Sequence, residues 1–345
     1  MTSFVCPLPL QNYGQIVLGH GGGGAMTDDL IAHLFAPAFE LNDELGDAAV
    51  LPFAPHGQLV FSTDSYVVNP PIFPGGNIGH LAVAGTVNDL AMMGATPLYL
   101  SAGFVLEEGL DLQVLTQIVQ AMAETAKQAG VRIVTGDTKV VERGHGDGIY
   151  INTAGIGRLD LPVGPHPKRA RPKDVLLING TLADHGMAIL SHRHGLELGP
   201  DMLSDTAPLN GLVANMLQEC PEIHVLRDLT RGGLAAAANE IARQAQVGLV
   251  FEEEKIPING AVLAACEILG IDPLQVANEG KLLAVVPEDR AQAVLSVMKN
   301  HPLGKQASEI GYVCGEHTGV VVGKTPFGST RIVDMPVGVL LPRIC

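Results

Sequence analysis

Residues 97–140 read PLYLSAGFVLEEGLDLQVLTQIVQAMAETAKQAGVRIVTGDTKV, and this stretch decides the fold. Its first part, Pro97–Val105, is an apolar run typical of a buried strand. Asp111–Ala129 carries apolar residues at helical spacing, begins with an Asp suited to an N-cap and is followed by Gly130 as a stop signal. Val131–Val140 then predicts a second strand. A strand, a helix and a strand in this order indicate an α/β protein.

The same alternation extends in both directions, and 345 residues are enough for two domains. We expect further N-terminal elements at Thr27–Phe39 (helix), Leu59–Val68 (strand), Asn77–Met93 (helix) and Gly148–Gly157 (strand). C-terminal strands are expected at Val175–Asn179, His224–Leu226, Leu249–Glu252, Leu282–Val286, Ile310–Cys314 and Gly319–Val322. C-terminal helices are expected at Gly232–Gln244, Gly260–Leu269 and Arg290–Lys299.

A segment with four prolines and four basic residues, 161–173, is the expected linker between the domains. It would separate an N-terminal domain, residues 1–160, from a C-terminal domain, residues 174–334. The last residues, 335–345, are expected to form a mobile tail that ends in a cysteine.

Charge is distributed unevenly along the chain, whose formal net charge is −15. Twelve acidic side chains and no Lys or Arg precede Lys127. Because such a region repels phosphate backbones and anionic lipids, nucleic acid and membrane surfaces are excluded as partners. Any phosphate group bound there requires a bridging cation.

The cysteines show no paired spacing, and there are five of them: Cys6, Cys220, Cys266, Cys314 and Cys345. An odd number without a C-x-x-C pair argues against a disulfide framework and favours a reducing compartment. The N-terminus lacks the basic region of a signal peptide, and no apolar run reaches about 18 residues. We therefore expect a cytoplasmic protein.

Acidic residues beside turns suggest a metal site in the N-terminal half. Asp47, Asp64, Asp89 and Asp137 each follow an expected strand or lie near a helix end. Carboxylates that converge from separate elements are the ligands that Mg²⁺ prefers. Each Asp taken alone is more simply a turn former or a helix cap. Four of them in one charge-depleted domain favour the metal site.

Two glycine-containing segments are candidates for binding phosphate. No P-loop motif occurs, but Gly21, Gly22, Gly23 and Gly24 follow His20 and can present backbone N–H groups to a polyphosphate. The alternative is an N-terminal linker. Asp228-Leu229-Thr230-Arg231-Gly232-Gly233 precedes an apolar helix, where Thr230 can cap the helix and Arg231 can bind an anion. The alternative there is an ordinary capped helix with a surface arginine.

Two further residues, Glu279 and Cys345, have reactive side chains whose roles cannot be assigned from their position in the sequence. Glu279 precedes an expected strand and is either a base or ligand, or simply a solvated loop acid. Cys345 is the last residue, and a terminal thiol on a mobile tail is a nucleophile in its thiolate form. It is not a prenylation signal, because that motif needs the cysteine four residues from the end.

These motifs together resemble one family over nearly the whole chain. They are residues 61–68 (FSTDSYVV), 73–79 (FPGGNIG), 85–89 (GTVND), 134–141 (VTGDTKVV), 231–233 (RGG), 278–282 (NEGKL) and 342–345 (PRIC). They are similar to those of the HypE family of hydrogenase-maturation carbamoyl dehydratases. Sibling families are aminoimidazole ribotide synthetase, selenophosphate synthetase and thiamine-phosphate kinase.

The resemblance implies a fold, a reaction and partners. The fold is the two-domain PurM-like α/β (α+β) fold, in which each domain is a mixed sheet packed with helices. The protein is a homodimer formed by its N-terminal domain, which binds ATP with Mg²⁺ near the dimer interface. A carbamoyl group on the terminal thiol is activated by ATP and dehydrated to a thiocyanate. The implied partners are a carbamoyltransferase that loads the thiol and an iron-carrying scaffold that accepts cyanide for nickel–iron hydrogenase.

The resemblance also implies roles for single residues, numbered as in this sequence. Cys345 is the carbamoyl carrier, Lys139 stabilises phosphate charge and Glu279 is the base. The Mg²⁺ ligands are Asp47, Asp64, Asp89 and Asp137. The ATP contacts are the four glycines 21–24, these four aspartates, Thr63, Asn88, Gly136, Thr138, Thr230 and Arg231. Siblings often carry two adjacent acids where this chain has Gly46-Asp47, which leaves the number of metal ions open.

Two alternatives stay open at the level of sequence. A sibling small-molecule kinase or synthetase would use the same ATP site and would not need Cys345. A non-catalytic maturation scaffold would deliver metal, a possibility prompted by the twelve histidines.

Overall fold

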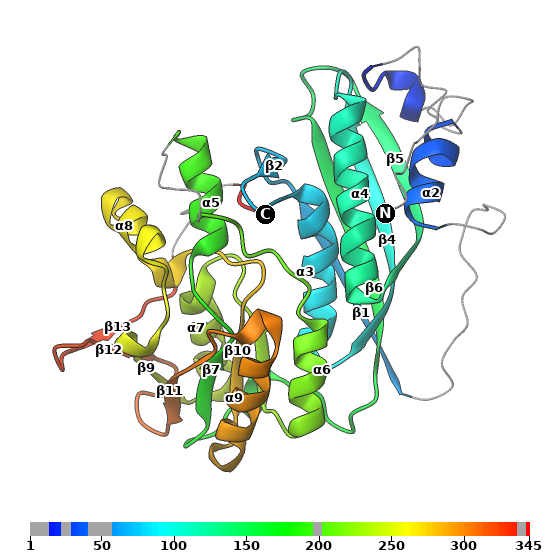
Figure 1. The fold of residues 1–345 in the computed structure, drawn as a ribbon. Helices are drawn as coiled ribbons and strands as arrows, with labels where there is room; N and C mark the ends of the chain where they lie inside the picture. The colour runs from blue at the N-terminus through cyan, green and yellow to red at the C-terminus, as the bar shows by residue number, and fades with distance from the viewer. Residues whose placement is uncertain (1–13, 22–28, 41–56, 196–201, 337–342) are drawn as a thin grey trace.

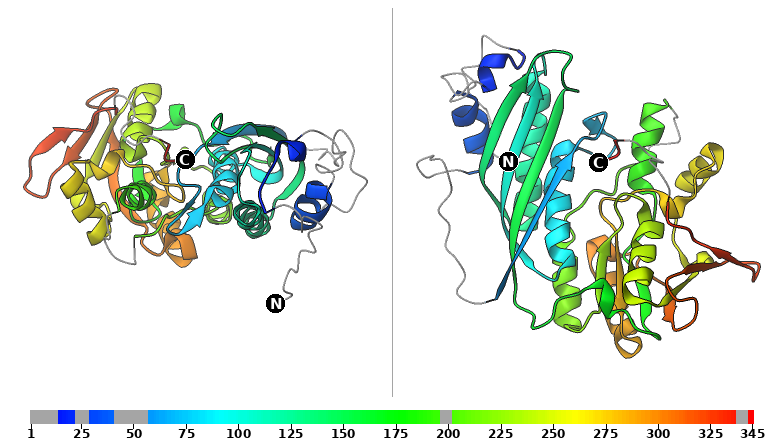
Figure 2. Two further views of the ribbon diagram at one scale, coloured as in Figure 1. Left: turned by 90° about the horizontal axis from the view of Figure 1, so that it is seen from above. Right: turned by 180° about the vertical axis from the view of Figure 1, so that it is seen from behind.

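The computed structural model describes residues 14–21, 29–40, 57–195, 202–336 and 343–345. Two α/β units lie side by side, and the C-terminus lies between them (Figures 1 and 2). None of the helices in these ranges is long and apolar enough to cross a lipid bilayer. The α/β class and the two-unit organisation expected from the sequence are confirmed.

The N-terminal unit is a four-stranded mixed sheet with two helices on one face (Figure 1). The strands, in the spatial order β1-β6-β4-β5, are β1 (Gln58–Tyr66), β6 (Ile149–Leu159), β4 (Thr96–Glu107) and β5 (Arg132–Val141). β4 pairs parallel with β5, and the other two pairings are antiparallel. The helices are α3 (Ile78–Met92) and α4 (Leu112–Ala129), and the short strands β2 (Ile72–Phe73) and β3 (Gly76–Asn77) precede α3.

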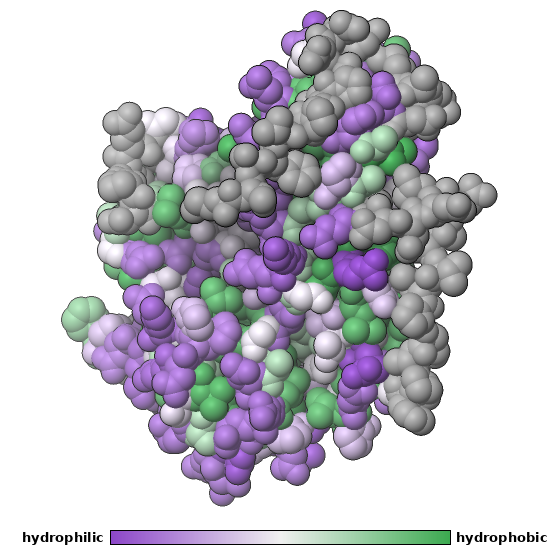
Figure 3. Space-filling model, turned by 45° about the vertical axis from the view of Figure 1, so that its right-hand side comes forward, coloured by the Kyte–Doolittle hydropathy of each residue, from purple (hydrophilic) through white to green (hydrophobic). Residues whose placement is uncertain are grey.

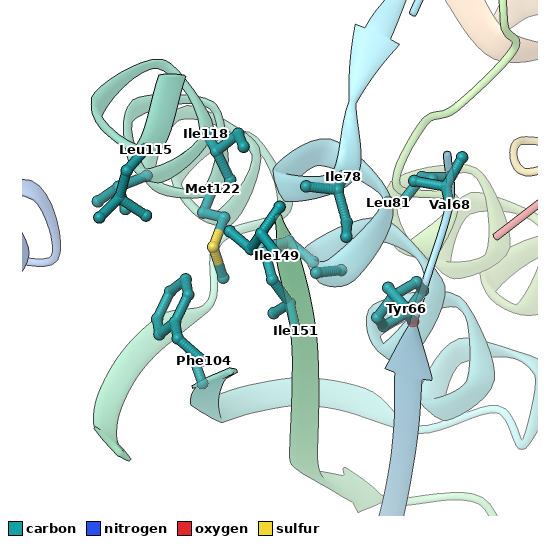
Figure 4. Packing of buried hydrophobic residues seen from close by; sticks show 14 of the residues in the cluster. Tyr66, Val68, Ile78, Leu81, Phe104, Leu115, Ile118, Met122, Ile149 and Ile151 are labelled. Atoms are coloured by element: carbon teal, nitrogen blue, oxygen red, sulfur yellow. The ribbon is translucent and has the colours of Figure 1, made fainter. Parts of the chain in front are cut away.

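Local signals begin and end both helices. The Asp111 side chain accepts a hydrogen bond from the N–H of Gln113 and caps α4, which ends at Gly130 in the left-handed conformation. Asn77 caps α3 by accepting from the N–H groups of Gly79 and His80. The apolar sides of both helices then pack on the inner face of the sheet, where Figure 4 shows residues of α3, α4, β1, β4 and β6 in one cluster.

The other face of this sheet is open. Strand residues alternate between the two faces, so that Ser62, Asp64 and Tyr66 point toward α3 while Leu59 and Phe61 point outward. Phe61 remains 65% exposed and Leu59 58%. Hydrophobic and hydrophilic residues are interspersed on the face of the molecule drawn in Figure 3.

The C-terminal unit is a seven-stranded sheet in the order β13-β12-β9-β11-β7-β10-β8. The strands are β7 (Val175–Ile178), β8 (Val225–Asp228), β9 (Gly248–Glu252), β10 (Leu282–Val286), β11 (Ser308–Cys314), β12 (Val321–Lys324) and β13 (Thr330–Ile332). The helices are α5 (Asp184–Arg193), α6 (Asn210–Glu219), α7 (Gly233–Ala245), α8 (Gly260–Leu269) and α9 (Ala291–Asn300). Separate apolar clusters cover the two faces of the sheet, and Ala91 and Met92 of α3 join the one that contains α6 and α9.

Most expected strands and helices occur within two residues of their predicted bounds. The helix expected at Thr27–Phe39 is found as a π-helix at Ile31–Phe35 followed by α2 (Ala36–Ala38), while residues 27 and 28 lie outside the described ranges. The expected linker 161–173 contains a short 3₁₀ turn at Pro167–Arg169.

Four features of the C-terminal unit differ from the expectation, and the first is strand β13 (Thr330–Ile332), which was not predicted. Helices α5 and α6 were not predicted, because no side chain caps the start of either one and because α5 is buried on all sides through Ser191, which leaves no amphipathic pattern. The prediction that Thr230 caps the next helix is wrong. Gly232, with φ 79°, is the N-cap of α7, and no side chain caps that helix.

Candidate active site between the two units

The C-terminal peptide lies against the segment that follows β1. The N–H of Val67 donates to the main-chain oxygen of Cys345 at 3.0 Å, and the N–H of Asn69 donates to the carbonyl of Arg343 at 3.3 Å. The guanidinium of Arg343 donates back to the carbonyl of Val67. Ile344 and Cys345 are buried, so the structure holds the end of the chain in a docked position. Residues 337–342 lie outside the described ranges, and the mobility of the tail stays a prediction.

The thiol of Cys345 lies in an apolar and negatively charged environment. Burial raises the pKa of Cys345, and the negative charges of Glu279, Asp64 and Asp228 raise it further. The positive charge of Arg231 lowers this pKa only in part. The free thiol is therefore protonated in the docked position. It is not poised there as a nucleophile.

Among the charged side chains, Glu279 has the largest effect on the pKa of this thiol, and it is itself buried. Its side chain is 3% exposed, and its Oε1 has no hydrogen-bond partner within the described part of the chain. Burial raises the pKa of Glu279 well above its usual range, and the charges of Asp205, Asp228 and Asp64 act in the same direction. A carboxyl group in this state takes up a proton readily, as a general base must.

The side chain of Asp205 holds the loop that carries Glu279. Its carboxylate accepts hydrogen bonds from the N–H of Glu279 at 3.0 Å and of Gly280 at 3.2 Å, and it pairs with the Lys281 ammonium at 2.8 Å. Gly280 is required by close approach, because a Cβ there would lie 1.9 Å from the Asp205 carbonyl oxygen. Backbone contacts therefore fix the direction of Glu279.

Three aspartates from different elements act on one another beside this loop. Asp64 comes from β1, Asp89 from α3 and Asp228 from the end of β8. Burial raises the pKa of Asp89, although Ser62 donates a hydrogen bond to it at 2.7 Å. Burial, followed by the charge of Asp89, raises the pKa of Asp228 to about 6. Raised pKa values of this kind are typical of carboxylates that a cation would neutralise.

The carboxylates are oxygen ligands of the kind that a hard cation such as Mg²⁺ prefers, but they do not form a complete coordination site. Within the described residues no three His, Cys, Asp or Glu side chains are arranged to hold a metal ion. Asp47, one of the four expected ligands, lies outside those residues. Asp137, another, is exposed and pairs with Lys139 at 2.8 Å. The structure thus brings together Asp64 and Asp89 of the expected set and adds Asp228.

The turn before α7 brings a cation to the same place. Arg231 is exposed, and its charge lowers the pKa of Asp89, Glu279 and Cys345. Thr230 lies in this turn, and its carbonyl accepts from the N–H of Gly233 at 2.9 Å. An exposed arginine beside a buried acidic site is suited to bind phosphate oxygens.

Residues expected on the sheet are divided between its faces. A register shift in the β4–β5 pairing puts Asp137 and Lys139 on the open face and Gly136 and Thr138 on the inner face. Thr63 also lies on the open face, where it accepts a hydrogen bond from Asn152. These open-face residues are not among the charges that shift the pKa of Cys345 or Glu279.

The remaining expected residues are Asn88 and the glycine run. Asn88 is buried, and its amide donates to the carbonyl of Ala207 at 3.1 Å and accepts from the N–H of Leu209 at 2.7 Å. Its side chain thus joins the two units. Gly21 ends a 3₁₀ turn at Leu18–Gly21, while Gly22, Gly23 and Gly24 lie outside the described residues.

Three residues at the site were not among the predicted site residues. Asp228 begins the motif that contains Thr230 and Arg231, but it was given no role there, although it ends a buried strand. Asp205 and His185 had no readable signal, since they act through backbone atoms of residues that are distant in sequence.

Comparison with known proteins first gives the class to which this fold and site belong. Residues 45–159 match the family AIR synthase related protein, N-terminal domain, and residues 171–324 match the corresponding C-terminal domain. The chain is thus a two-domain member of the AIR synthase related class.

Full-length relatives then give the family. The chain is 51% identical to the carbamoyl dehydratase HypE of Azotobacter vinelandii, over 98% of this chain and 99% of that protein. A crystal structure of hydrogenase maturation protein HypE in complex with ATP superimposes with a TM-score of 0.91 at 47% identity, over 95% of this chain and 99% of that one. A crystal structure of a HypE–HypF complex matches with a TM-score of 0.79 at 47% identity, over 91% of this chain and 100% of that one. The chain belongs to the HypE family of carbamoyl dehydratases.

Proposed function

We propose that the chain uses ATP to dehydrate a carbamoyl group carried on Cys345 and so forms a thiocyanate for the cyanide ligand of nickel–iron hydrogenase. The observation that carries this proposal is the docked position of Cys345, buried between the two units and under the charge of Glu279. A terminal cysteine placed beside a buried base is suited to carry a substrate that is processed in place.

The reaction balances with the groups at the site. The carbamoyl oxygen attacks the γ-phosphorus of ATP and releases ADP, and the nitrogen loses one proton to solvent as the O–P bond forms. The C–O bond then breaks, phosphate leaves, and the second N–H proton passes to Glu279. Phosphorylation is needed because the oxygen of an amide is a poor leaving group.

The nucleotide belongs between the acidic cluster and Arg231. A relative has been crystallised with ATP, and the raised pKa values of Asp89 and Asp228 support the binding of a neutralising cation by these carboxylates. We assign Asp64, Asp89 and Asp228 to Mg²⁺, which when bound would screen the phosphate charge from these acids. Arg231 would contact phosphate oxygens directly. Asp47 and the glycines 21–24 remain predicted contributors.

A homodimer is supported by the open face of the N-terminal sheet. Leu59, Phe61 and Val105 are exposed on this face at 58%, 65% and 39%, and a second copy would cover them. Lys139 and Asp137 lie on the same face, so in a dimer they would border the interface. Because this face is opposite the one toward which Asp64 points, the phosphate-handling role of Lys139 stays a prediction.

The partners follow from the reaction. A carbamoyltransferase must load Cys345, and a HypE–HypF complex has been solved for a relative. An iron-carrying maturation scaffold must accept the cyanide. The four cysteines in the described residues are free, which is consistent with a reducing cytoplasm as the compartment.

A variant of the terminal thiol separates this function from that of a sibling kinase. Cys345→Ala should abolish ATP hydrolysis that depends on the carbamoylating partner, while ATP binding stays within about twofold of wild type, because the acidic cluster and Arg231 are unchanged. Calorimetric ATP binding and phosphate release measure the two effects. Full turnover by Cys345→Ala on a diffusible substrate would contradict the proposal.

A further inference from the structure

One buried side chain of the C-terminal unit holds the backbone of the terminal peptide. The ring of His185, in the first turn of α5, is completely buried, and its Nε2 lies 2.7 Å from the carbonyl oxygen of Ile344. Ile344 immediately precedes Cys345. We propose that His185 is a positioning residue that holds the C-terminal peptide in the site and sets the place of Cys345.

The hydrogen bonds around the ring fix its tautomer. A carbonyl oxygen can only accept, so Nε2 of His185 carries the proton and donates to Ile344. Nδ1 then accepts from the hydroxyl of Ser204 at 2.8 Å, and that hydroxyl in turn accepts from the N–H of Thr206 at 3.2 Å. The edge of Phe73 meets the ring at 85° with centroids 5.6 Å apart. Burial lowers the pKa of His185 and so favours this neutral form.

The contact joins the two units through the peptide. The N–H groups of Val67 and Asn69, which hold the peptide on its other side, belong to the N-terminal unit. His185 belongs to the C-terminal unit. Arg193 of the same helix also donates to the peptide, at the carbonyl of Arg343, and His185 makes its contact one residue closer to Cys345. A peptide held from both sides has its last residue fixed relative to both units.

The same loop that orients His185 also holds the base. The hydroxyl of Ser204 donates to Nδ1 of the His185 ring, and the carboxylate of the next residue, Asp205, accepts a hydrogen bond from the N–H of Glu279. The loop that contains Ser204 and Asp205 therefore positions both the terminal peptide, through His185, and Glu279. The importance of this shared loop for catalysis rests on the proposed function, whereas the docking role of His185 does not.

The test is the accessibility of Cys345 in the full chain without nucleotide. Iodoacetamide is added, and alkylation of the C-terminal peptide is followed by mass spectrometry. His185→Leu removes the hydrogen bond and leaves the carbonyl of Ile344 without this donor. Alkylation of Cys345 should therefore be about tenfold faster in this variant. His192→Leu, a change to an exposed histidine of the same helix, should leave the rate unchanged.

Two amide variants keep the test valid if the leucine variant is poorly folded. The amide of Gln reaches the place of Nε2, so His185→Gln should alkylate at close to the wild-type rate. The shorter Asn reaches only the place of Nδ1, so His185→Asn should behave like the leucine variant. Alkylation of buried Cys220 in the same samples reports global opening. Equal rates for Cys345 in wild type, His185→Gln and His185→Asn would overturn the proposal.

A second readout separates this role from the function. With ATP and the carbamoylating partner, His185→Asn should lower kcat with the KM for ATP unchanged, and His185→Gln should recover most of kcat. The alkylation rates could follow the expected order while neither wild type nor any variant dehydrates the carbamoyl group on Cys345. The proposed function would then fail, and the docking role of His185 would stand.

Discussion

Among single residues, Glu279 has the environment that a base of this reaction needs. It is buried, its Oε1 is unpaired within the described residues, and four neighbours impose charge on it. The carboxylate of Asp205 accepts from the backbone N–H groups of Glu279 and Gly280 and so fixes the backbone of the loop that carries this carboxyl.

Replacing Glu279 by its neutral isostere tests the base directly. Glu279→Gln removes the proton acceptor without changing the volume, so single-turnover dehydration should fall by about 10²–10⁴. In wild type the rate should rise with pH as Glu279 loses its proton, because only the ionised form is a base, and the variant should lose this dependence. Glu254→Gln, at an exposed position, is the matched control. An unchanged pH profile in Glu279→Gln would exclude the base role.

Asp228 predicts a dependence of stability on pH. Its pKa is raised to about 6, so the folded chain binds its proton more tightly than the unfolded chain does. The stability that this proton contributes is present below about pH 4 and is lost as the pH rises to about 6. Asp228→Asn should therefore be more stable than wild type at pH 8, by up to about 3 kcal/mol, and equal to it at pH 4.

Urea unfolding without nucleotide or metal, at both pH values, measures this difference. Asp289→Asn, at an exposed position of the same unit, controls for a general effect of charge. If Asp228→Asn were no more stable than wild type at pH 8, burial would not be raising the pKa of Asp228.

Among elements, loops and turns determine the site more than the strands do. The Glu279 loop packs against residues 203–207 with no space for a side chain at Gly280. The turn before α7 brings Arg231 to the acids, and the segment after β1 receives the tail.

A methyl group at Gly280 should displace the loop that carries Glu279. Gly280→Ala puts a Cβ 1.9 Å from the Asp205 carbonyl, so we expect a loss of about 1–3 kcal/mol of unfolding free energy together with slower dehydration. Gly260→Ala is the matched control, because nothing lies within 4 Å of its Cβ, and it should be neutral or slightly stabilising. Equal stability of the two variants would show that the loop is not tightly packed at Gly280.

The elements differ in how far the sequence predicts them. Helix α4 is predicted to the residue, because Asp111 and Gly130 are local signals that tertiary packing does not override. Helix α5 is not, because its burial on all sides removes the amphipathic pattern. The acids of the site lie in short motifs, and the sequence places Asp64, Asp89 and Glu279 among the candidates. The sequence does not predict His185 and Asp205 as site residues, because they contact backbone atoms of residues more than 70 positions away.

At the scale of the whole molecule, the two units are arranged around the end of the chain (Figure 1). Asn88 joins them at the junction and His185 at the tail. The open sheet face of the N-terminal unit lies across the sheet from α3 and α4, so a dimer formed there would not cover the docked tail (Figures 1 and 2).

A charge on the open face should disrupt the dimer. Phe61→Glu places a carboxylate in the proposed interface, so the chain should sediment as a monomer where wild type sediments as a dimer. Phe327→Glu is the matched control, since Phe327 is 97% exposed in the turn between β12 and β13 of the other unit. Dimers that persist in Phe61→Glu would place the interface elsewhere.

The mass of the C-terminal peptide tests the central claim most directly. Wild-type protein is incubated with ATP, Mg²⁺ and the carbamoylating partner, and the peptide that ends in Cys345 is analysed by mass spectrometry. We expect a carbamoylated peptide that then loses the mass of one water while one phosphate is released for each thiol. Consumption of ATP with a carbamoylated Cys345 that never loses water would contradict it.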